Sequence, residues 1–163
     1  RKHWLNDDYV KFIRFGEHFI EKNGEGVLAF INPHGYLDNP TFRGMRWHLL
    51  QTFDKIYTID LHGNSKKKET APDGSVDQNV FDIMQGVSIN IFVKTGDKSK
   101  SELAKVFHHD VFGKRNDKYD FLLNNFIEDI SFVELKPQTG QYPFVTNEML
   151  GLAAYDNYLC VSG

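Results

Sequence analysis

The amino-acid sequence predicts an α/β fold built on a mixed sheet. Amphipathic helical patterns and short apolar strand patterns alternate from residue 7 to residue 61, which is typical of a sheet covered by helices. A third strand pattern, at 86–94, follows a long polar loop that has no helical pattern. Because a parallel connection needs a crossover, usually a helix, we expect this third strand to run antiparallel to its neighbour.

The first element is a helix over residues 7–23. Its apolar side chains recur at intervals of three and four residues, as on one face of a helix. Asp7 or Asp8 can cap its start, and Gly24 suits its end. The apolar face consists of Tyr9, Phe12, Ile13, Phe19 and Ile20. By periodicity alone, these side chains are expected in the core.

Two strands and a helix come next. The run 26–32, "GVLAFIN", is short and apolar, which is typical of a strand buried on both faces. In the helix expected at 41–53, Arg43 and Arg46 share one face, which we expect to be exposed to solvent. The strand at 55–61 follows, and the order of elements predicts a parallel pair joined by a right-handed crossover.

Beyond a charged linker, the sequence predicts a small α+β extension. Its elements are a strand within 103–113, a helix at 115–126 and a strand within 130–137. We place a boundary near residue 97, so that the two regions are 1–97 and 98–163. The last twenty residues show no clear pattern.

The composition is that of a soluble globular protein, with 40% hydrophobic and 25% charged residues. A net charge of −3 argues against a chain-wide nucleic-acid-binding surface but leaves a local basic patch open. The single cysteine, Cys160, cannot form an internal disulfide and suits a cytoplasmic location. No apolar run approaches the roughly 20 residues of a membrane span. The chain begins without Met, and we expect it to be a fragment of a longer protein.

Two groups of polar residues could carry chemistry. The "HHD" run at 108–110 offers three metal-capable groups, but His108 and His109 would point to opposite faces of a strand. We therefore expect no metal site there. The lysines of the "KKK" run, Lys66, Lys67 and Lys68, either grip phosphates or form a solvated loop.

Phe81 stands in a polar surround just before the third strand. Two interpretations are open. It is either a hydrophobic plug at the entrance of the strand or a stacking platform for a planar ring.

Three segments together resemble one family. They are "DDYVKFIRFGEHFIEKNGEGVLAFINPHGYLDNPTFRGMRWHLL", "KIYTIDLHGNSKKKETAPDGS" and "NVFDIMQGVSINIFVK". In this order they resemble the second half of a gamma-class N6-adenine DNA methyltransferase, of the kind found within single-chain restriction–modification enzymes. The resemblance covers roughly residues 4 to 135. It implies a partial S-adenosylmethionine-dependent methyltransferase sheet, Rossmann-like, with its last three strands present and one of them antiparallel.

The resemblance also implies site residues. Phe12, with Tyr9 one turn earlier, matches the position that packs on the adenine ring of S-adenosylmethionine. Phe81 matches the aromatic residue that stacks on a flipped-out target adenine. The loop 62–80 would lie near double-stranded DNA, so that Lys66–Lys68 would contact its phosphates.

Two motifs of that family are absent from this sequence: the Gly-rich turn that binds the cofactor, and the Asn-Pro-Pro-aromatic motif that holds the adenine amino group. We therefore expect no catalytic residue in this chain and no activity from it alone. An unpaired, apolar edge at 26–32 would favour self-association. The alternatives are a non-catalytic binding module that reuses half of the fold, and a methyltransferase acting on RNA or protein.

Overall fold

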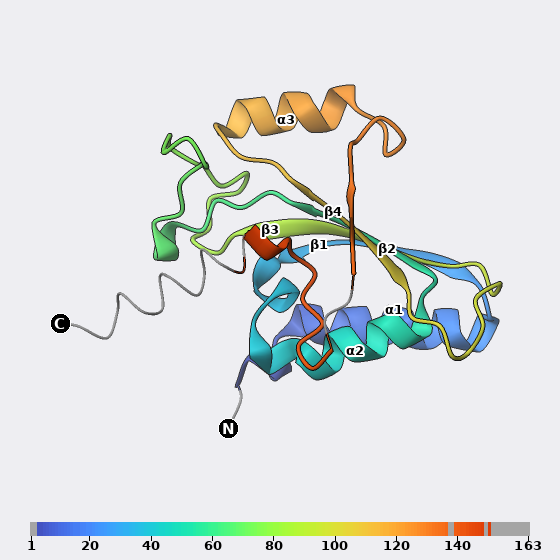
Figure 1. Cartoon of the computed structure of the whole chain (residues 1–163). Helices are drawn as coiled ribbons and strands as arrows, with labels where there is room; N and C mark the ends of the chain where they lie inside the picture. Colours follow the sequence, from blue (N-terminus) through green and yellow to red (C-terminus); the bar gives the residue numbers. More distant parts are fainter. Residues whose placement is uncertain (1–2, 137–138, 149, 151–163) are drawn as a thin grey trace.

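The protein is described by a computed structural model over residues 3–136, 139–148 and 150. A five-stranded mixed sheet of order β1-β3-β2-β4-β5 forms its centre, with helices on both faces (Figure 1). The strands are β1 (Gly26–Pro33), β2 (Lys55–Asp60), β3 (Val87–Lys94), β4 (Lys105–Asp110) and β5 (Val133–Leu135). The α-helices are α1 (Asp8–Asn23), α2 (Arg43–Thr52) and α3 (Arg115–Asn124). The predicted α/β class and mixed sheet are confirmed.

The position of β3 decides the topology. It pairs antiparallel with both β1 and β2, so the predicted antiparallel direction of this strand is confirmed. The predicted direct pairing of β1 with β2 is wrong, because β3 lies between them. One face of β3, with Ser88, Asn90 and Phe92, is buried, and the other face, with Ile89 and Ile91, is half-buried.

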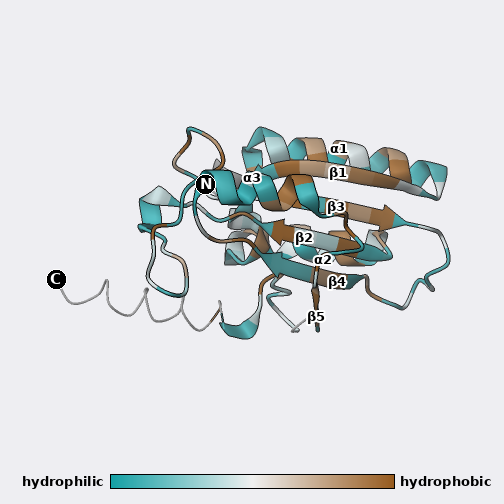
Figure 2. Ribbon diagram, turned by 90° about the horizontal axis from the view of Figure 1, so that it is seen from above, coloured by the Kyte–Doolittle hydropathy of each residue, from teal (hydrophilic) through white to brown (hydrophobic). Residues whose placement is uncertain are grey.

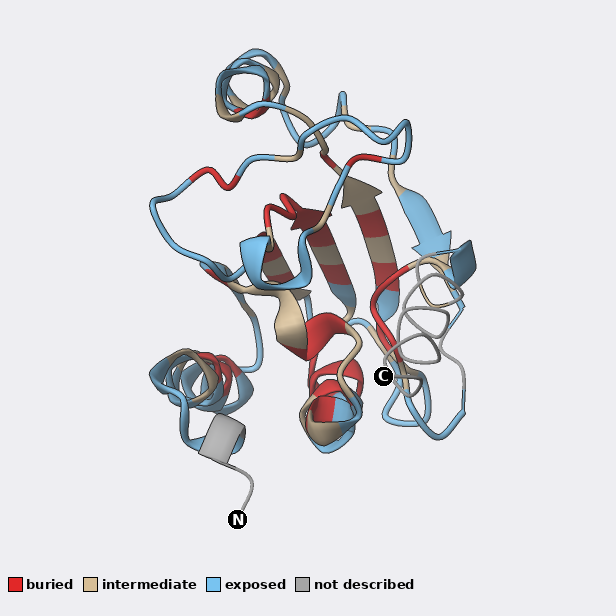
Figure 3. Cartoon of the chain, turned by 90° about the vertical axis from the view of Figure 1, so that its left-hand side faces the viewer, coloured by how far each residue is buried: buried red, intermediate tan, exposed pale blue. Residues whose placement is uncertain are grey.

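The sheet separates two hydrophobic cores. The larger core lies against α1 and α2 and contains Ile13, Leu50 and Phe92. The smaller core contains Ile59 and Val87, with α3 side chains packed on it. Figure 3 shows α1 and α2 together on one side of the sheet and α3 on the other.

Strand β1 lies at the edge of the sheet, as Figure 2 shows from above. It was expected to be buried on both faces, and this is wrong: Val27 is 64% exposed and Ile31 is 49% exposed. The reason is that α3 packs over Ile59 and Val87, so no described element covers the outer face of β1. The strand is apolar although the described part of the chain leaves its face with Val27 and Ile31 open.

Helix α1 buries a narrower stripe than its periodicity suggests. Ile13 and Ile20 are buried as expected, and Glu17 is buried between them. Phe12 and Phe19 are exposed, so the expectation of a core position is wrong for these two. They lie at the margin of the apolar stripe, where a small rotation of the helix decides burial.

Arg46 is fully buried, although the sequence pattern placed it with Arg43 on an exposed face. Its guanidinium donates to four backbone carbonyls, and burial lowers its pKa to about 10. Those carbonyls belong to Tyr36, Asn39, Gln141 and Tyr142. Arg43, at the start of α2, is exposed as expected.

The extension belongs to the same sheet as the first region. β4 follows the expected boundary near residue 97 and pairs parallel with β2, and β5 pairs antiparallel with β4. Within the described ranges, no helix is long and apolar enough to cross a membrane. Cys160 and most of the last twenty residues lie outside the described part of the chain.

Candidate functional site

Several chain segments meet at one end of the sheet, where strands terminate. We call this end the carboxyl edge, to distinguish it from the lateral edge formed by β1. β1, β2 and β4 end there and β3 begins there, because β3 runs antiparallel to its neighbours. The loop from residue 61 to residue 86 extends from this edge (Figure 1). α1 leads into β1 through a tight turn at Gly24, so the first turns of α1 lie toward the same edge. Carboxyl ends of strands are where α/β proteins place their binding sites.

A cluster of five ionisable side chains closes this edge. We name it the His62 cluster, and its members are His34, Asp60, His62, Glu69 and Asp110. The His62 ring lies 2.8 Å from Glu69 through Nδ1 and 2.7 Å from Asp110 through Nε2. His34 Nδ1 lies 2.9 Å from an Asp60 oxygen. His62 is 1% exposed, so these contacts lie in a medium where charge interactions are strong.

The His62 cluster is charged at neutral pH. Burial acts to lower the pKa of His62. The Asp60 carboxylate and the hydrogen bonds to Asp110 and Glu69 outweigh burial and raise this pKa to about 10. Burial acts to raise the pKa of the Asp60 carboxyl, but His34 and His62 hold it below its ordinary value. The positively charged imidazolium of His62, placed between carboxylates, thus stabilises the carboxyl end of β2.

Some groups within the cluster have distances that suit a metal ion, for example Asp60, His62 and Asp110. Protonated His62, however, donates from both ring nitrogens, to Glu69 and to Asp110. An imidazole ligand must offer a free lone pair. The geometry therefore fits ion pairing between the segment after β2 and the last residue of β4.

A buried ion pair joins α3 to the same edge. Lys118 Nζ lies 2.8 Å from Asp77 Oδ1, and both side chains are 0% exposed. Lys118 also donates to the carbonyls of Leu61 and Gln78. Asp77 accepts backbone N–H groups from residues 63 and 113. The ion pair and these four hydrogen bonds join parts of the chain that are remote in sequence.

The loop crosses itself beside this ion pair. Gly63 has a φ of +78°, and a Cβ there would lie 2.4 Å from the Cα of Asn79. Only glycine allows such a close approach. The Asn79 side chain donates to the carbonyls of Gly63 and Gln85, and its Oδ1 accepts the N–H of Phe81. The crossing therefore fixes the backbone on which Phe81 stands.

Phe81 is presented to solvent by a held backbone. Its side chain is 43% exposed, and the neighbouring Ile83 and Met84 are also exposed. The plug interpretation is not favoured by this exposure, because a plug would be covered. We call residues 78–85 the Phe81 segment.

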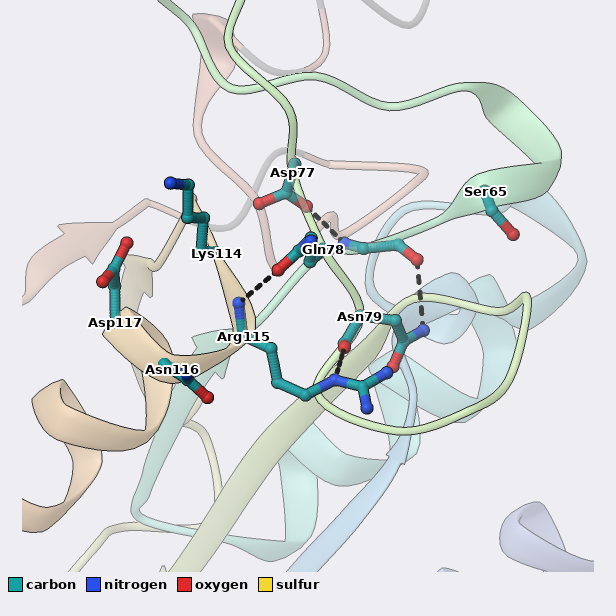
Figure 4. Close-up of a pocket in the computed structure, with 9 residues that line it drawn as sticks. Ser65, Asp77, Gln78, Asn79, Lys114, Arg115, Asn116 and Asp117 are labelled. Atoms are coloured by element: carbon teal, nitrogen blue, oxygen red, sulfur yellow. Dashed lines mark hydrogen bonds between the residues drawn. The ribbon is translucent and has the colours of Figure 1, made fainter.

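A hollow of about 600 Å³ lies between the loop and the start of α3 (Figure 4). Its walls are polar, from Ser65 on one side to Lys114 and Arg115 on the other. Lys66, Lys67 and Lys68 follow Ser65 directly, and all three are exposed. Asn64 accepts the N–H of Lys67 and so caps this short turn. The three lysines thus stand on the surface of the loop that carries the Phe81 segment.

The two residues expected at a cofactor differ in their surroundings. Phe12 is 59% exposed, with its ring 6.3 Å from that of Phe30. Tyr9 is half-buried, its ring lies 6.3 Å from that of Phe42, and burial raises its pKa. Phe12 has a free apolar face, and Tyr9 supports the helix beside it.

The structure shows site residues that sequence reasoning missed. Asp77, Asn79, Arg115 and Lys118 fix the Phe81 segment, and none of them stands in a periodic pattern. The one available signal was the long polar loop itself, since such loops are often functional. His108 and His109 do point to opposite faces, as expected: His108 is buried beside Thr58, and His109 stacks on Phe121.

The His62 cluster predicts a pH dependence of stability. The raised pKa of His62 stabilises the fold fully below its ordinary pKa of 6.5 and no longer above about 10. The free energy of unfolding should therefore fall between these values, by at most about 1.4 kcal/mol per pH unit for one proton. Urea unfolding at pH 6.5, 8 and 9.5 measures it. His62→Gln should show a flatter dependence over this range.

The exposed His18 on α1 supplies the matched control. His18→Gln should keep the pH dependence of the unsubstituted chain. Parallel curves for His62→Gln and the unsubstituted chain would show that His62 does not carry this charge.

Comparison with solved structures finds the same fold within larger proteins. One is the structure determined by cryo-EM as a DrdV–DNA complex, with a TM-score of 0.72 and 27% identity over 88% of this chain and 14% of that chain. A second is the ATP-dependent Type ISP restriction-modification enzyme LlaBIII bound to DNA, with a TM-score of 0.72 and 27% identity over 86% of this chain and 10% of that one.

A third similar structure is a nuclease-deletion mutant of the Type ISP restriction-modification enzyme LlaGI in complex with a DNA substrate mimic. Its TM-score is 0.70, with 24% identity over 90% of this chain and 12% of that one, and this likeness concerns the fold alone. No protein-family model and no curated protein matches the chain. The chain therefore shares its fold with one segment of Type ISP restriction-modification enzymes and spans 10% to 14% of the length of these three chains.

Proposed function

We propose that this chain is part of a cytoplasmic DNA adenine-N6 methyltransferase within a restriction–modification enzyme. The observation that carries it is an exposed Phe81 on a firmly held backbone, at the sheet edge where strands end. The similarity to DNA-bound restriction–modification enzymes supports the DNA partner. S-adenosylmethionine would supply the methyl group.

Phe81 would stack on the target adenine. The amino nitrogen of adenine is buried in a duplex, so the base must leave the helix and be held in a pocket. An exposed ring on a fixed backbone offers the face of such a pocket without reorganisation. Stacking of a base on an aromatic side chain contributes about 1–3 kcal/mol. Groups outside this sequence would bind the amino group, because the Asn-Pro-Pro-aromatic motif is absent from it.

Phe12 would contribute one wall of a cofactor site. The exposed ring suits packing on a planar adenine, and the ring of Phe30 lies beside it at 6.3 Å. Tyr9 would keep α1 in place through its contact with Phe42 and is less suited to direct contact. The residues present therefore fit one side of the adenine ring of the cofactor.

The lysines 66–68 would contact phosphates of double-stranded DNA. They are exposed and stand on the loop that carries Phe81, so a duplex that delivers its base to Phe81 passes near them. The alternative function is a non-catalytic binding module. The lack of a Gly-rich turn in this sequence favours it, and it predicts DNA binding without any methyl transfer in the full-length protein.

Substitution of Phe81 tests the proposal. In the full-length enzyme, Phe81→Ala should lower the rate of methyl transfer to an adenine-containing duplex about 5- to 150-fold, because the stacking free energy is lost. Binding of S-adenosylmethionine, measured by calorimetry, should stay within about 3-fold.

Phe126→Ala is the matched control, since Phe126 is also an exposed aromatic, 79% exposed, and lies beyond α3. It should leave the rate unchanged. An equal loss of methyl transfer and cofactor binding in Phe81→Ala would show that Phe81 is structural.

The lysines are tested through the salt dependence of DNA binding. Replacement of Lys66, Lys67 and Lys68 by Gln should flatten the plot of log affinity against log salt by about 0.9 for each lysine that contacts a phosphate. Fluorescence anisotropy of a labelled duplex at several salt concentrations measures the slope.

The control is a triple Gln variant at three exposed lysines of the opposite sheet edge, Lys55, Lys100 and Lys105. It changes the net charge equally and should keep the original slope. The assignment fails if both triple variants change the slope equally, because net charge would then explain the effect.

A further inference from the structure

We infer that helix α3 is the positioning element of the base pocket, with Arg115 as the residue that sets the place of Phe81. This inference rests on the proposed function, in which Phe81 stacks on an extruded base. Side chains on one face of α3 hold four consecutive carbonyl oxygens, those of residues 78–81.

The Arg115 side chain donates to the backbone carbonyls that precede and follow the Phe81 N–H. Its Nε donates to the Asn79 carbonyl at 2.7 Å, and its Nη2 donates to the Phe81 carbonyl at 3.1 Å. Nη2 also lies 2.8 Å from the Asp82 carboxylate. Figure 4 shows the Arg115 side chain extended along the loop toward Asn79. A planar guanidinium with several donors suits such a multiple contact, and a lysine cannot reproduce it.

The next turn of α3 binds the remaining two carbonyls. Lys118 donates to the Gln78 carbonyl at 2.7 Å, and the Tyr119 hydroxyl donates to the Val80 carbonyl. Residues 115, 118 and 119 are three and four apart, so they share one helix face. The face of α3 that meets the loop is therefore polar, because it binds backbone carbonyls.

Four of these contacts are made to backbone carbonyls, and α3 also reaches the Asp82 and Gln78 side chains through Arg115. A backbone held at four successive carbonyls cannot rotate freely, so the direction of the Phe81 ring is set before a base arrives. Misplacement of a reacting group by about 1 Å can cost on the order of 100-fold in rate. Loss of Arg115 should therefore act on the pocket through Phe81.

The test uses the full-length enzyme with two matched duplexes: one has adenine at the target position and measures methyl transfer, and the other has 2-aminopurine at that position and measures fluorescence. 2-Aminopurine emits strongly when unstacked and weakly when stacked. Arg115→Ala should lower kcat for methyl transfer about 10- to 100-fold, keep the DNA dissociation constant within about 3-fold, and raise the emission of the bound duplex to the level seen with Phe81→Ala.

Non-additivity tests whether Arg115 acts through Phe81. The double variant Phe81→Ala, Arg115→Ala should be no slower than Phe81→Ala alone. Tyr119→Phe removes one hydroxyl at a partly exposed site and should change kcat and emission in the same direction, by less. The Tyr119→Phe variant still tests the inference if Arg115→Ala folds poorly.

Arg43→Ala is the control, because Arg43 is the exposed first residue of α2 as Arg115 is the first residue of α3. It should behave as the unsubstituted enzyme. The inference is overturned if the losses from Phe81→Ala and Arg115→Ala multiply, or if Arg115→Ala and Tyr119→Phe keep normal emission while Phe81→Ala does not. If Phe81→Ala itself leaves rate and emission unchanged, the proposed function fails instead.

Discussion

The ion pair between Asp77 and Lys118 is the interaction on which the site depends. Both side chains are fully buried, and burial of two charges costs several kcal/mol for each ion. Hydrogen bonds offset this cost: Asp77 accepts two backbone N–H groups, and Lys118 donates to two carbonyls besides its partner. Removal of either partner would leave an unpaired buried charge, which typically destabilises a protein by about 3–5 kcal/mol.

This pair connects four parts of the chain at one point. They are the end of β2, the loop before β3, the turn after β4 and α3. On the neighbouring side, the His62 cluster ties together the carboxyl ends of β1, β2 and β4 through charged hydrogen bonds. Between these two ionic centres Gly63 crosses Asn79, and the crossing presents Phe81. A polar, fully bonded framework thus holds one apolar ring at the surface.

Local patterns in the sequence predict the elements and the direction of β3, because periodicity and the lack of a crossover helix act within short windows. They do not predict that β3 separates β1 from β2, since sheet order depends on contacts far apart in sequence. The same limit explains Arg46: its partners at residues 141 and 142 lie about ninety-five residues away. Asp77 and Lys118 likewise come from a polar loop and a polar helix, whose composition is typical of solvated surfaces.

Phe81 is the residue of the candidate site that the sequence singles out. Its polar surround raised the question of exposure, and the exposed ring is the answer. The resemblance supplied a role for it, and the framework around it came only from the structure. The outer face of β1 shows the reverse case, in which a strongly apolar run reads as buried although nothing in the described part of the chain covers it.

The central claim is that one buried ion pair holds both α3 and the Phe81 segment. Amide hydrogen exchange in Lys118→Met measures it directly, because methionine keeps the length of the side chain without its charge. The amides of Gln78 and Phe81, which donate to Gly113 and Asn79, should lose protection together with the amides of α3, while Ile89 within β3 stays protected. Normal protection of Gln78 and Phe81 in this variant would contradict the claim.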